Sequence, residues 1–188
     1  MSSNSTPSPW DVLSDEREAD CRIFEVRRLR CRHPDGREGE FFVLDTSDWV
    51  NVVALTPEDE LILVRQHRFA SGELSWEVPG GVIDPGENPI EAAIRELHEE
   101  TGFVGEKVRS IGSCRPNPAI LRNHCHFVLV EGAKLTAETD FDPNEELETR
   151  LLPLREATSW AKEGRIEHAL SLDALYFLWL ERGAFDGD

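Results

Sequence analysis

Residues 78–88, VPGGVIDPGEN, form a segment rich in glycine and proline that interrupts regular structure and leads directly into a helical pattern. Asn88 is suited to the N-cap and Pro89 to the first helical position, and Glu91 can complete a capping box with Asn88. Gly102 then supplies the residue at which a helix commonly stops. The pattern predicts a helix that begins at Pro89, ends just before Gly102 and follows a tight loop.

This predicted helix carries an apolar face and an acidic face. The apolar residues recur at i, i+3, i+4 and i+7, which predicts a face packed on the core: Ile90, Ala93, Ile94 and Leu97. Glu96, Glu99 and Glu100 lie at i, i+3 and i+4, so their carboxylates share an arc of about 100°. Such carboxylates repel one another, and a hard cation such as Mg²⁺ would remove the conflict and serve phosphate chemistry. From the helix alone, the alternative is a solvated acidic face.

The segments around the helix have the composition of β-strands. Four of them precede it and three follow it: 21–31, 40–46, 49–55 and 60–66, then 108–112, 124–131 and 148–154. The first two flank an Asp-Gly turn and are predicted to form a hairpin. Two helices separated near Gly164 end the chain. Strands on both sides of a central helix, with further helices at the end, predict an α/β sandwich with a mixed sheet.

The charge of the chain excludes several classes of partner. Its 188 residues include 20 Lys and Arg against 37 Asp and Glu, a formal net charge of −17. Nucleic-acid binders normally carry a basic stripe, so we expect no nucleic-acid partner. No apolar run approaches the roughly 20 residues that cross a bilayer, and residues 1–9 do not resemble a signal peptide. We therefore expect no membrane partner and a cytoplasmic location.

The four cysteines carry no signature of a metal site or of a disulfide framework. Their spacing matches neither CxxC nor a zinc-ligand pattern: Cys21, Cys31, Cys114 and Cys125. We interpret them as reduced, mostly buried thiols.

From Gly81 the chain reads GVIDPGENPIEAAIRELHEETGF, which resembles the Nudix box at every fixed position. The fixed positions are Gly81, Glu87, Arg95-Glu96-Leu97, Glu99-Glu100 and Gly102-Phe103. The flanking runs VRQHR (64–68) and SWEVPGG (75–81), and Pro118 sixteen residues after Gly102, resemble the ADP-ribose and nucleoside-diphosphate-sugar pyrophosphatase branch of that family. The closing run WAKEGRIEHALSLDALYFLWL is similar to that branch as well.

The resemblance implies a Nudix α/β/α sandwich with a mixed β-sheet and a small N-terminal antiparallel β segment. We therefore expect a disordered tail over residues 1–9, an N-terminal β segment over 10–48 and a Nudix hydrolase domain over 49–188. Members of this branch are typically homodimers whose N-terminal segment crosses to the partner. We expect a homodimer here too, since an isolated hairpin is only marginally stable in water.

The resemblance also implies a set of metal ligands and catalytic residues. The metal ligands by motif position are Gly80, through its backbone carbonyl, Glu96, Glu99 and Glu100. The resemblance of the C-terminal run adds Glu145 as a further ligand. Arg95 lies four residues before Glu99 and is expected to orient it. Glu87 is likewise expected to support the ligands without binding the metal. Glu145 aligns with a loop carboxylate that assists the attacking water, although its surroundings alone would suggest a solvated loop. The implied catalytic residues are Arg95, Glu99, Glu100 and Glu145.

Four further residues are expected at the substrate: Arg65, Arg68, Glu77 and Pro118. Without the resemblance, Arg65 and Arg68 could both be plain surface charges. Arg68 is the better candidate for a diphosphate contact because the resemblance places an arginine at that position. Glu77 read alone could simply cap the loop, and Pro118 lies close to the position of the branch's marker proline.

The resemblance implies hydrolysis of ADP-ribose or a nucleoside diphosphate sugar to a nucleoside monophosphate and a sugar phosphate. The partner is then a small nucleoside diphosphate derivative, and the cofactor is Mg²⁺, with Mn²⁺ as the alternative, at two to three ions per site. Two other functions stay open. One is a Nudix hydrolase of modified nucleoside triphosphates or dinucleoside polyphosphates, and the other is a module that senses a nucleotide without catalysis.

Overall fold

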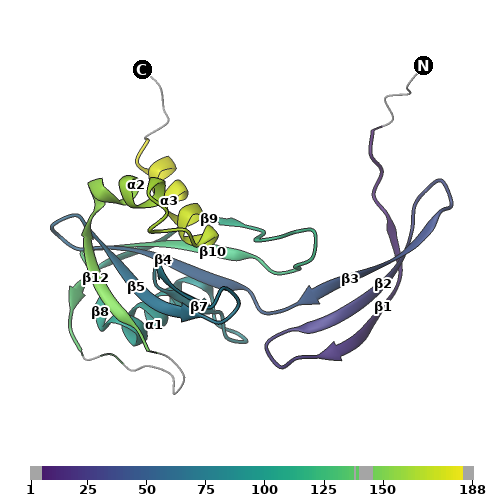
Figure 1. The fold of residues 1–188 in the computed structure, drawn as a ribbon, viewed down its shortest axis with the longest axis horizontal. Helices are drawn as coiled ribbons and strands as arrows, with labels where there is room; N and C mark the ends of the chain where they lie inside the picture. The colour runs from purple at the N-terminus through teal and green to yellow at the C-terminus, as the bar shows by residue number, and fades with distance from the viewer. Residues whose placement is uncertain (1–5, 138, 140–145, 184–188) are drawn as a thin grey trace. The chain divides into compact units, whose positions relative to one another are not determined.

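The structure is a computed structural model that describes residues 6–137, 139 and 146–183 (Figure 1). The chain divides into two compact units. The N-terminal unit contains Met1–Ser47 and Arg115–Asn123, and the main unit contains Asp48–Cys114 and His124–Asp188. No helix within the described ranges combines the length and the apolar character that a membrane span requires.

The N-terminal unit is a three-stranded antiparallel sheet in the order β1-β2-β3. Its strands are β1 (Asp11–Asp20), β2 (Glu25–Arg32) and β3 (Glu38–Asp45). The hairpin of β2 and β3 was predicted and is confirmed, with the His33 N–H donating to the Arg37 carbonyl across the turn at 2.9 Å. The strand β1 was not anticipated, because its sequence DVLSDEREAD lacks the apolar alternation of a half-buried strand.

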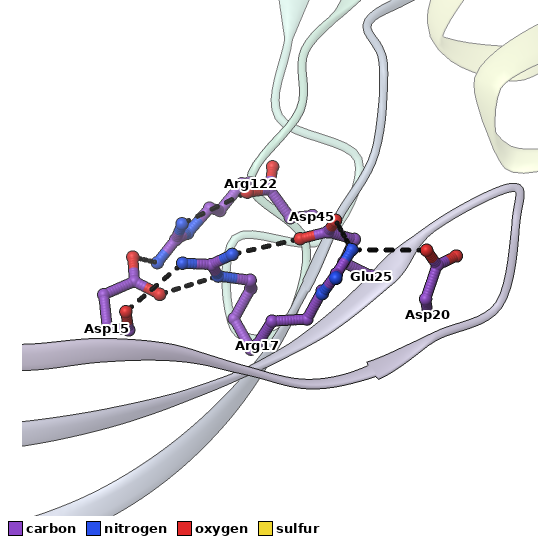
Figure 2. Close-up of polar contacts among 7 residues, drawn as sticks. Asp15, Arg17, Asp20, Glu25, Asp45 and Arg122 are labelled. Atoms are coloured by element: carbon purple, nitrogen blue, oxygen red, sulfur yellow. Dashed lines mark hydrogen bonds and ion pairs between the residues drawn. The ribbon is translucent and has the colours of Figure 1, made fainter.

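Ion pairs join the strands of this unit to the segment 115–123. Arg27 on β2 donates to the Asp15 carboxylate on β1 at 2.8 Å. Arg122 donates to the same carboxylate at 2.7 Å and to Asp45 at 3.3 Å, as Figure 2 shows. Hydrogen bonds from Arg122 and Arg27 lower the pKa of Asp15. Charged pairs therefore connect these strands where apolar packing is sparse.

The main unit is built on a seven-stranded sheet with the order β12-β5-β4-β10-β9, in which β6 pairs with β5 and β7 with β4. Its strands are β4 (Trp49–Leu55), β5 (Glu60–Arg68), β6 (Glu73–Glu77), β7 (Gly80–Val82), β9 (Lys107–Cys114), β10 (Cys125–Glu131) and β12 (Glu148–Pro153). The pair β4 and β10 is parallel and the other pairs are antiparallel. The predicted mixed sheet is confirmed. A separate two-stranded ladder joins β8 (Phe103–Val104) to β11 (Lys134–Leu135).

Helices cover both faces of this sheet (Figure 1). The helix α1 (Pro89–Thr101) lies on one face, and α2 (Leu154–Lys162) and α3 (Ala169–Glu181) lie on the other. The sheet thus has one hydrophobic core on each face. Successive side chains of β4 enter these two cores in turn, because they point to opposite faces of the sheet. Val52 packs in the core that contains Leu97 of α1, and Val53 packs in the core that contains Leu175 of α3. The expected α/β/α sandwich is therefore confirmed.

Both ends of α1 are closed as predicted. The Asn88 side chain accepts hydrogen bonds from the backbone N–H groups of Ile90 and Glu91, at 3.0 and 3.1 Å. The Glu91 carboxylate accepts from the Asn88 N–H at 3.2 Å, which completes the capping box. At the other end Gly102 adopts φ 71° and donates its N–H to the carbonyl of His98. The helix is thus fixed on both sides of the three glutamates.

The predicted apolar face of α1 is wrong in part. Ile90 and Ile94 are 38% and 43% exposed, whereas Ala93 and Leu97 are buried as expected. The face toward the sheet is instead formed by Ala92, Ala93 and Leu97, which are buried in one core with the strands.

The four cysteines are free thiols. Cys31 and Cys125 are buried, Cys114 is half-buried and Cys21 is exposed. Burial and the nearby Asp173 carboxylate raise the pKa of Cys114 to about 11. Reduced thiols agree with the interpretation of the sequence, although only two of the four are buried.

Candidate active site

A cavity of about 480 Å³ opens in the main unit between α1, the strand β7 and the end of β5. The three glutamates of α1 line it together with Gly80, Arg68 and Arg95. These residues lie in the sequence between 68 and 100, but the tight loop before α1 folds them onto one opening. The predicted metal ligands Gly80, Glu96, Glu99 and Glu100 are therefore neighbours, and Arg68 faces the same space.

The glycine loop and the helix α1 are in close contact where they line this cavity. Glu100 is only 4% exposed, and its carboxylate accepts a hydrogen bond from the Gly80 N–H at 3.0 Å. A Cβ on Gly80 would lie 2.2 Å from the Val50 carbonyl oxygen, and a Cβ on Gly81 would lie 2.3 Å from Glu96 Oε1. Both positions therefore require glycine for close approach, which explains why the loop contains two in succession.

Arg95 holds the acidic residues around it. Its guanidinium contacts Glu87 at 2.9 Å, Glu96 at 2.8 Å and Glu99 at 3.1 Å, and it donates to the Val82 carbonyl at 3.0 Å. The hydrogen bond with Glu87 is the main cause that raises the pKa of Arg95, and the same bond lowers the pKa of Glu87. The predicted salt bridge between Arg95 and Glu99 is present, and it is one of three.

Arg68 faces the cavity and is held from behind by Glu77. The Arg68 Nε and Nη2 atoms donate to the two Glu77 carboxylate oxygens at 2.8 and 2.5 Å. The Glu77 side chain is 1% exposed. Burial alone would raise the pKa of Glu77, but the Arg68 hydrogen bonds and the charge of His168 outweigh it and hold the pKa below its usual range. Glu77 thus lies beneath Arg68, outside the lining of the cavity.

Three predicted site residues remain, Arg65, Pro118 and Glu145. Arg65 contacts Glu148 at 3.7 Å and stacks over Trp76 at 5.6 Å, and it does not line the cavity. Pro118 belongs to the segment of the N-terminal unit. Glu145 lies outside the described residues.

Three residues that line the cavity were not anticipated, Gln66, Val82 and Asp84. Gln66 lies two residues before Arg68 on β5, so the period of a strand puts both on the same face. Asp84 lies in the loop before α1, and its place in the turn-rich segment was a signal that could have identified it.

The donor set fits a hard divalent cation. Three carboxylates and a backbone carbonyl are oxygen ligands of the kind that Mg²⁺ and Mn²⁺ prefer, and all four border one cavity. Glu96 and Glu99 are here paired with Arg95. Across the described part of the chain, no three His, Cys, Asp or Glu side chains are grouped closely enough to hold an ion. The carboxylates would therefore shift from Arg95 to coordinate one.

Comparison with known proteins agrees with this architecture. The family model for the NUDIX domain matches residues 47–175. A CMP-5′-(N-acetyl-N-hydroxy-3-aminopropyl)phosphonate hydrolase of Streptomyces rubellomurinus is 30% identical over 146 residues, which cover 78% of this chain and 70% of the relative. The ADP-ribose pyrophosphatase of Bacillus subtilis is 28% identical over 149 residues, or 79% and 80% of the two chains.

A solved structure described as an ADP compounds hydrolase has the same fold. It superposes with a TM-score of 0.84 at 23% identity and covers 97% of this chain and 98% of its own. The match to the family model spans well over half of the chain and includes the capped helix, its three glutamates and the glycine loop. The chain belongs to the Nudix family of hydrolases.

Proposed function

We propose that this Nudix hydrolase cleaves the diphosphate of ADP-ribose or a nucleoside diphosphate sugar and releases a nucleoside monophosphate and a sugar phosphate. The observation that carries the proposal is the joint lining of one cavity by Glu96, Glu99, Glu100 and Arg68. Carboxylates suited to divalent cations and an arginine suited to phosphate oxygens are the two components that hydrolysis of a phosphate anhydride requires. The relatives named as ADP-ribose pyrophosphatases support this substrate class.

Nudix enzymes generally use divalent metal ions. We propose Mg²⁺ at two to three ions per site, with Mn²⁺ as the alternative, held by the Gly80 carbonyl and by Glu96, Glu99 and Glu100. When bound, the ions would lower the pKa of the attacking water and neutralise the diphosphate oxygens. Glu100 already fixes the Gly80 peptide through its hydrogen bond at 3.0 Å, so the ligands from the loop and from the helix are held in one arrangement.

The arginines would have different tasks. Arg68 lines the cavity and presents its guanidinium to the anionic substrate, which explains how a chain of net charge −17 can attract a diphosphate. Arg95 positions Glu96 and Glu99 and balances their charge until a cation binds. We propose Arg95 as a positioning residue, since its partners include every predicted ligand on α1 except Glu100.

The proton of the attacking water requires a carboxylate. We propose Glu145 for this role, with a glutamate of α1 as the alternative, and Glu145 lies outside the described residues. We also propose a homodimer formed through the N-terminal unit. The apolar residues that its strands leave exposed, Val12, Leu13, Phe41 and Phe42, support such an interface.

The test is product analysis by chromatography with Mg²⁺ and a panel of substrates: ADP-ribose, UDP-glucose, GDP-mannose, a CMP-linked phosphonate and ATP. The phosphonate is included because one relative is named for a substrate of that kind. We expect AMP and ribose 5-phosphate from ADP-ribose, or the corresponding pair from another sugar nucleotide. Cleavage of ATP alone would contradict the proposal and favour a triphosphate hydrolase.

The matched variants are Glu100→Gln and Glu156→Gln. Glu100→Gln keeps the shape of a buried side chain but removes the charge of a proposed ligand, so we expect turnover to fall by at least 10²-fold. Glu156 is half-exposed on α2, and its substitution should leave turnover unchanged. Equal activity of the two variants would contradict the assignment of Glu100. Binding of ADP-ribose without any turnover, with either metal, would indicate the sensing module.

A further inference from the structure

The buried carboxylate of Glu77 has a second partner besides Arg68. His168 Nδ1 lies 3.1 Å from Glu77 Oε2, and neither residue lines the cavity. His168 is separated from Glu77 by ninety residues in the sequence and lies immediately before α3. One carboxylate therefore joins the arginine of the cavity to the first turn of a helix on the far face of the sheet.

Ser171, in the first turn of α3, reinforces this contact. It is fully buried, its Oγ accepts a hydrogen bond from the Val78 N–H at 3.1 Å, and it lies 3.0 Å from His168 Nδ1. Val78 directly follows Glu77 and precedes the glycine loop. The start of α3 thus contacts both the side chain of Glu77 and the backbone next to it.

The His168 ring contacts Glu77 and Ser171 through one nitrogen. Nδ1 lies 3.1 Å from Glu77 Oε2, within ion-pair distance, and shares a hydrogen bond with Ser171 Oγ at 3.0 Å. An ionised carboxylate can only accept hydrogen bonds, so a proton on Nδ1 would make the ring the donor in the contact with Glu77. Burial lowers the pKa of His168 despite the opposing charge of Glu77, while Arg68 lowers it further and Asp173 raises it. The contact therefore places a half-buried imidazole against the carboxylate that holds Arg68.

The ring of His168 does not cap the backbone of α3. His168 occupies the N-cap position of α3, yet its side chain makes no capping hydrogen bond. The N-cap position favours Ser, Thr, Asp or Asn, whose side chains would satisfy the free N–H groups of the first turn. At this position the side chain is instead directed to Glu77, which indicates a task outside the helix.

We propose that His168 and Ser171 are positioning residues that act through Glu77 and Val78 to fix the Arg68 guanidinium in the cavity. Neither residue lines the cavity, so neither is expected to touch the substrate. The expected effect on substrate binding rests on the proposed function, in which Arg68 contacts the diphosphate. The expected effect on the position of the Arg68 guanidinium is independent of that function.

The first test measures Arg68 directly by NMR. The Nε–H of Arg68, which Glu77 accepts at 2.8 Å, should give a slowly exchanging signal, identified by its loss in Arg68→Lys. We expect this signal to broaden or vanish in His168→Ala and Ser171→Ala, and to persist in Ser159→Ala, an exposed serine on α2. An unchanged signal in folded His168→Ala overturns the proposal, whatever the substrate is.

The second test measures binding by calorimetry, with ADP-ribose as the probe and EDTA present so that no turnover occurs. We expect His168→Ala to weaken binding about tenfold, and in turnover assays to raise KM with little change in kcat. His168→Asn, whose amide can donate from a similar position, should restore most of the affinity. Equal affinity of wild type and His168→Ala overturns the proposal, as does a variant whose kcat falls while its KM is kept.

The two tests separate the proposal from the proposed function. If the wild type does not hydrolyse ADP-ribose or a sugar nucleotide with Mg²⁺ or Mn²⁺, the proposed function fails while the NMR result still decides the role of His168. If Ser171→Ala does not fold, His168→Ala and His168→Asn carry both measurements, because the His168 side chain is partly exposed and its removal leaves a smaller cavity.

Discussion

Alanine in place of Gly80 or Gly81, two neighbouring residues that line the cavity, should affect different properties of the protein. In Gly81→Ala the new methyl group would lie 2.3 Å from Glu96 Oε1 and 2.5 Å from its carboxyl carbon. In Gly80→Ala it would lie 2.2 Å from the Val50 carbonyl oxygen. The first neighbour is the end of a side chain that can rotate away, and the second is strand backbone that cannot.

The distance sets the size of the expected effect. Carbon and oxygen without a strong hydrogen bond approach to about 3.3 Å, so the Glu96 carboxylate must retreat by about 1 Å in Gly81→Ala. A displacement of about 1 Å in catalytic machinery can reduce turnover about 10²-fold, or about 2.7 kcal/mol of activation free energy. The backbone of Gly81 has no positive φ, so we expect its free energy of unfolding to change by less than about 1 kcal/mol.

Gly80→Ala is the matched comparison. Its methyl group meets β4, where Gly80 pairs with Asn51, and the strands must separate to accommodate it. Overpacking of this kind costs about 1–3 kcal/mol. We therefore expect Gly80→Ala to lose stability, and activity as well where the shift moves the proposed Gly80 ligand, and Gly81→Ala to lose activity alone.

Urea unfolding followed by fluorescence, together with turnover of ADP-ribose at saturating Mg²⁺, distinguishes the two variants. Full activity in Gly81→Ala would show that the position of Glu96 does not matter for turnover. A loss of stability in Gly81→Ala equal to that in Gly80→Ala would show that the loop is not organised around the Glu96 carboxylate. Either result would refute the reasoning.

Three further predictions follow from the described contacts. Asn88→Ala removes a cap that satisfies two N–H groups, so urea unfolding should show a loss of about 0.5–2 kcal/mol, and an unchanged midpoint would contradict the cap. A thiol reagent should label Cys21 rapidly in the native protein and the other three cysteines mainly on unfolding. Cys31 and Cys125 are buried, and the pKa of Cys114 is raised to about 11. Equally fast labelling of all four thiols would refute this prediction. The lowered pKa of Glu77 means that its ion pair contributes stability above the unfolded pKa of about 4.5, and this contribution is lost as pH falls. Unfolding free energy should therefore fall more steeply between about pH 6 and pH 3 in the wild type than in Glu77→Gln, and parallel curves would contradict it.

Local signals in the sequence predicted the parts of the site that depend on local contacts. The capping box of Asn88 and Glu91 and the stop at Gly102 involve residues at most four apart, so their pattern is readable without the fold. The salt bridge of Arg95 with Glu99 is one helical turn long and was predicted for the same reason.

The parts that failed depend on tertiary contacts. Ile90 and Ile94 match helical periodicity, but the helix buries Ala92 with Ala93 and Leu97 instead, and the side that faces the strands is not fixed by periodicity alone. The strand β1 was missed because it is held by ion pairs with β2, such as Asp15 with Arg27. The contact of Glu77 with His168 joins positions ninety residues apart, and no pattern in a single sequence indicates it.

The most direct measurement of the central claim is a ³¹P NMR time course of ADP-ribose with this protein and Mg²⁺. If the cavity of Glu96, Glu99, Glu100 and Arg68 hydrolyses a nucleoside diphosphate derivative, the diphosphate signals should decline while two phosphomonoester signals rise in equal amounts. The Glu100→Gln variant should slow both changes together. Diphosphate signals that stay constant in ADP-ribose and in the sugar nucleotides, or the release of inorganic phosphate as the first product, would contradict the account.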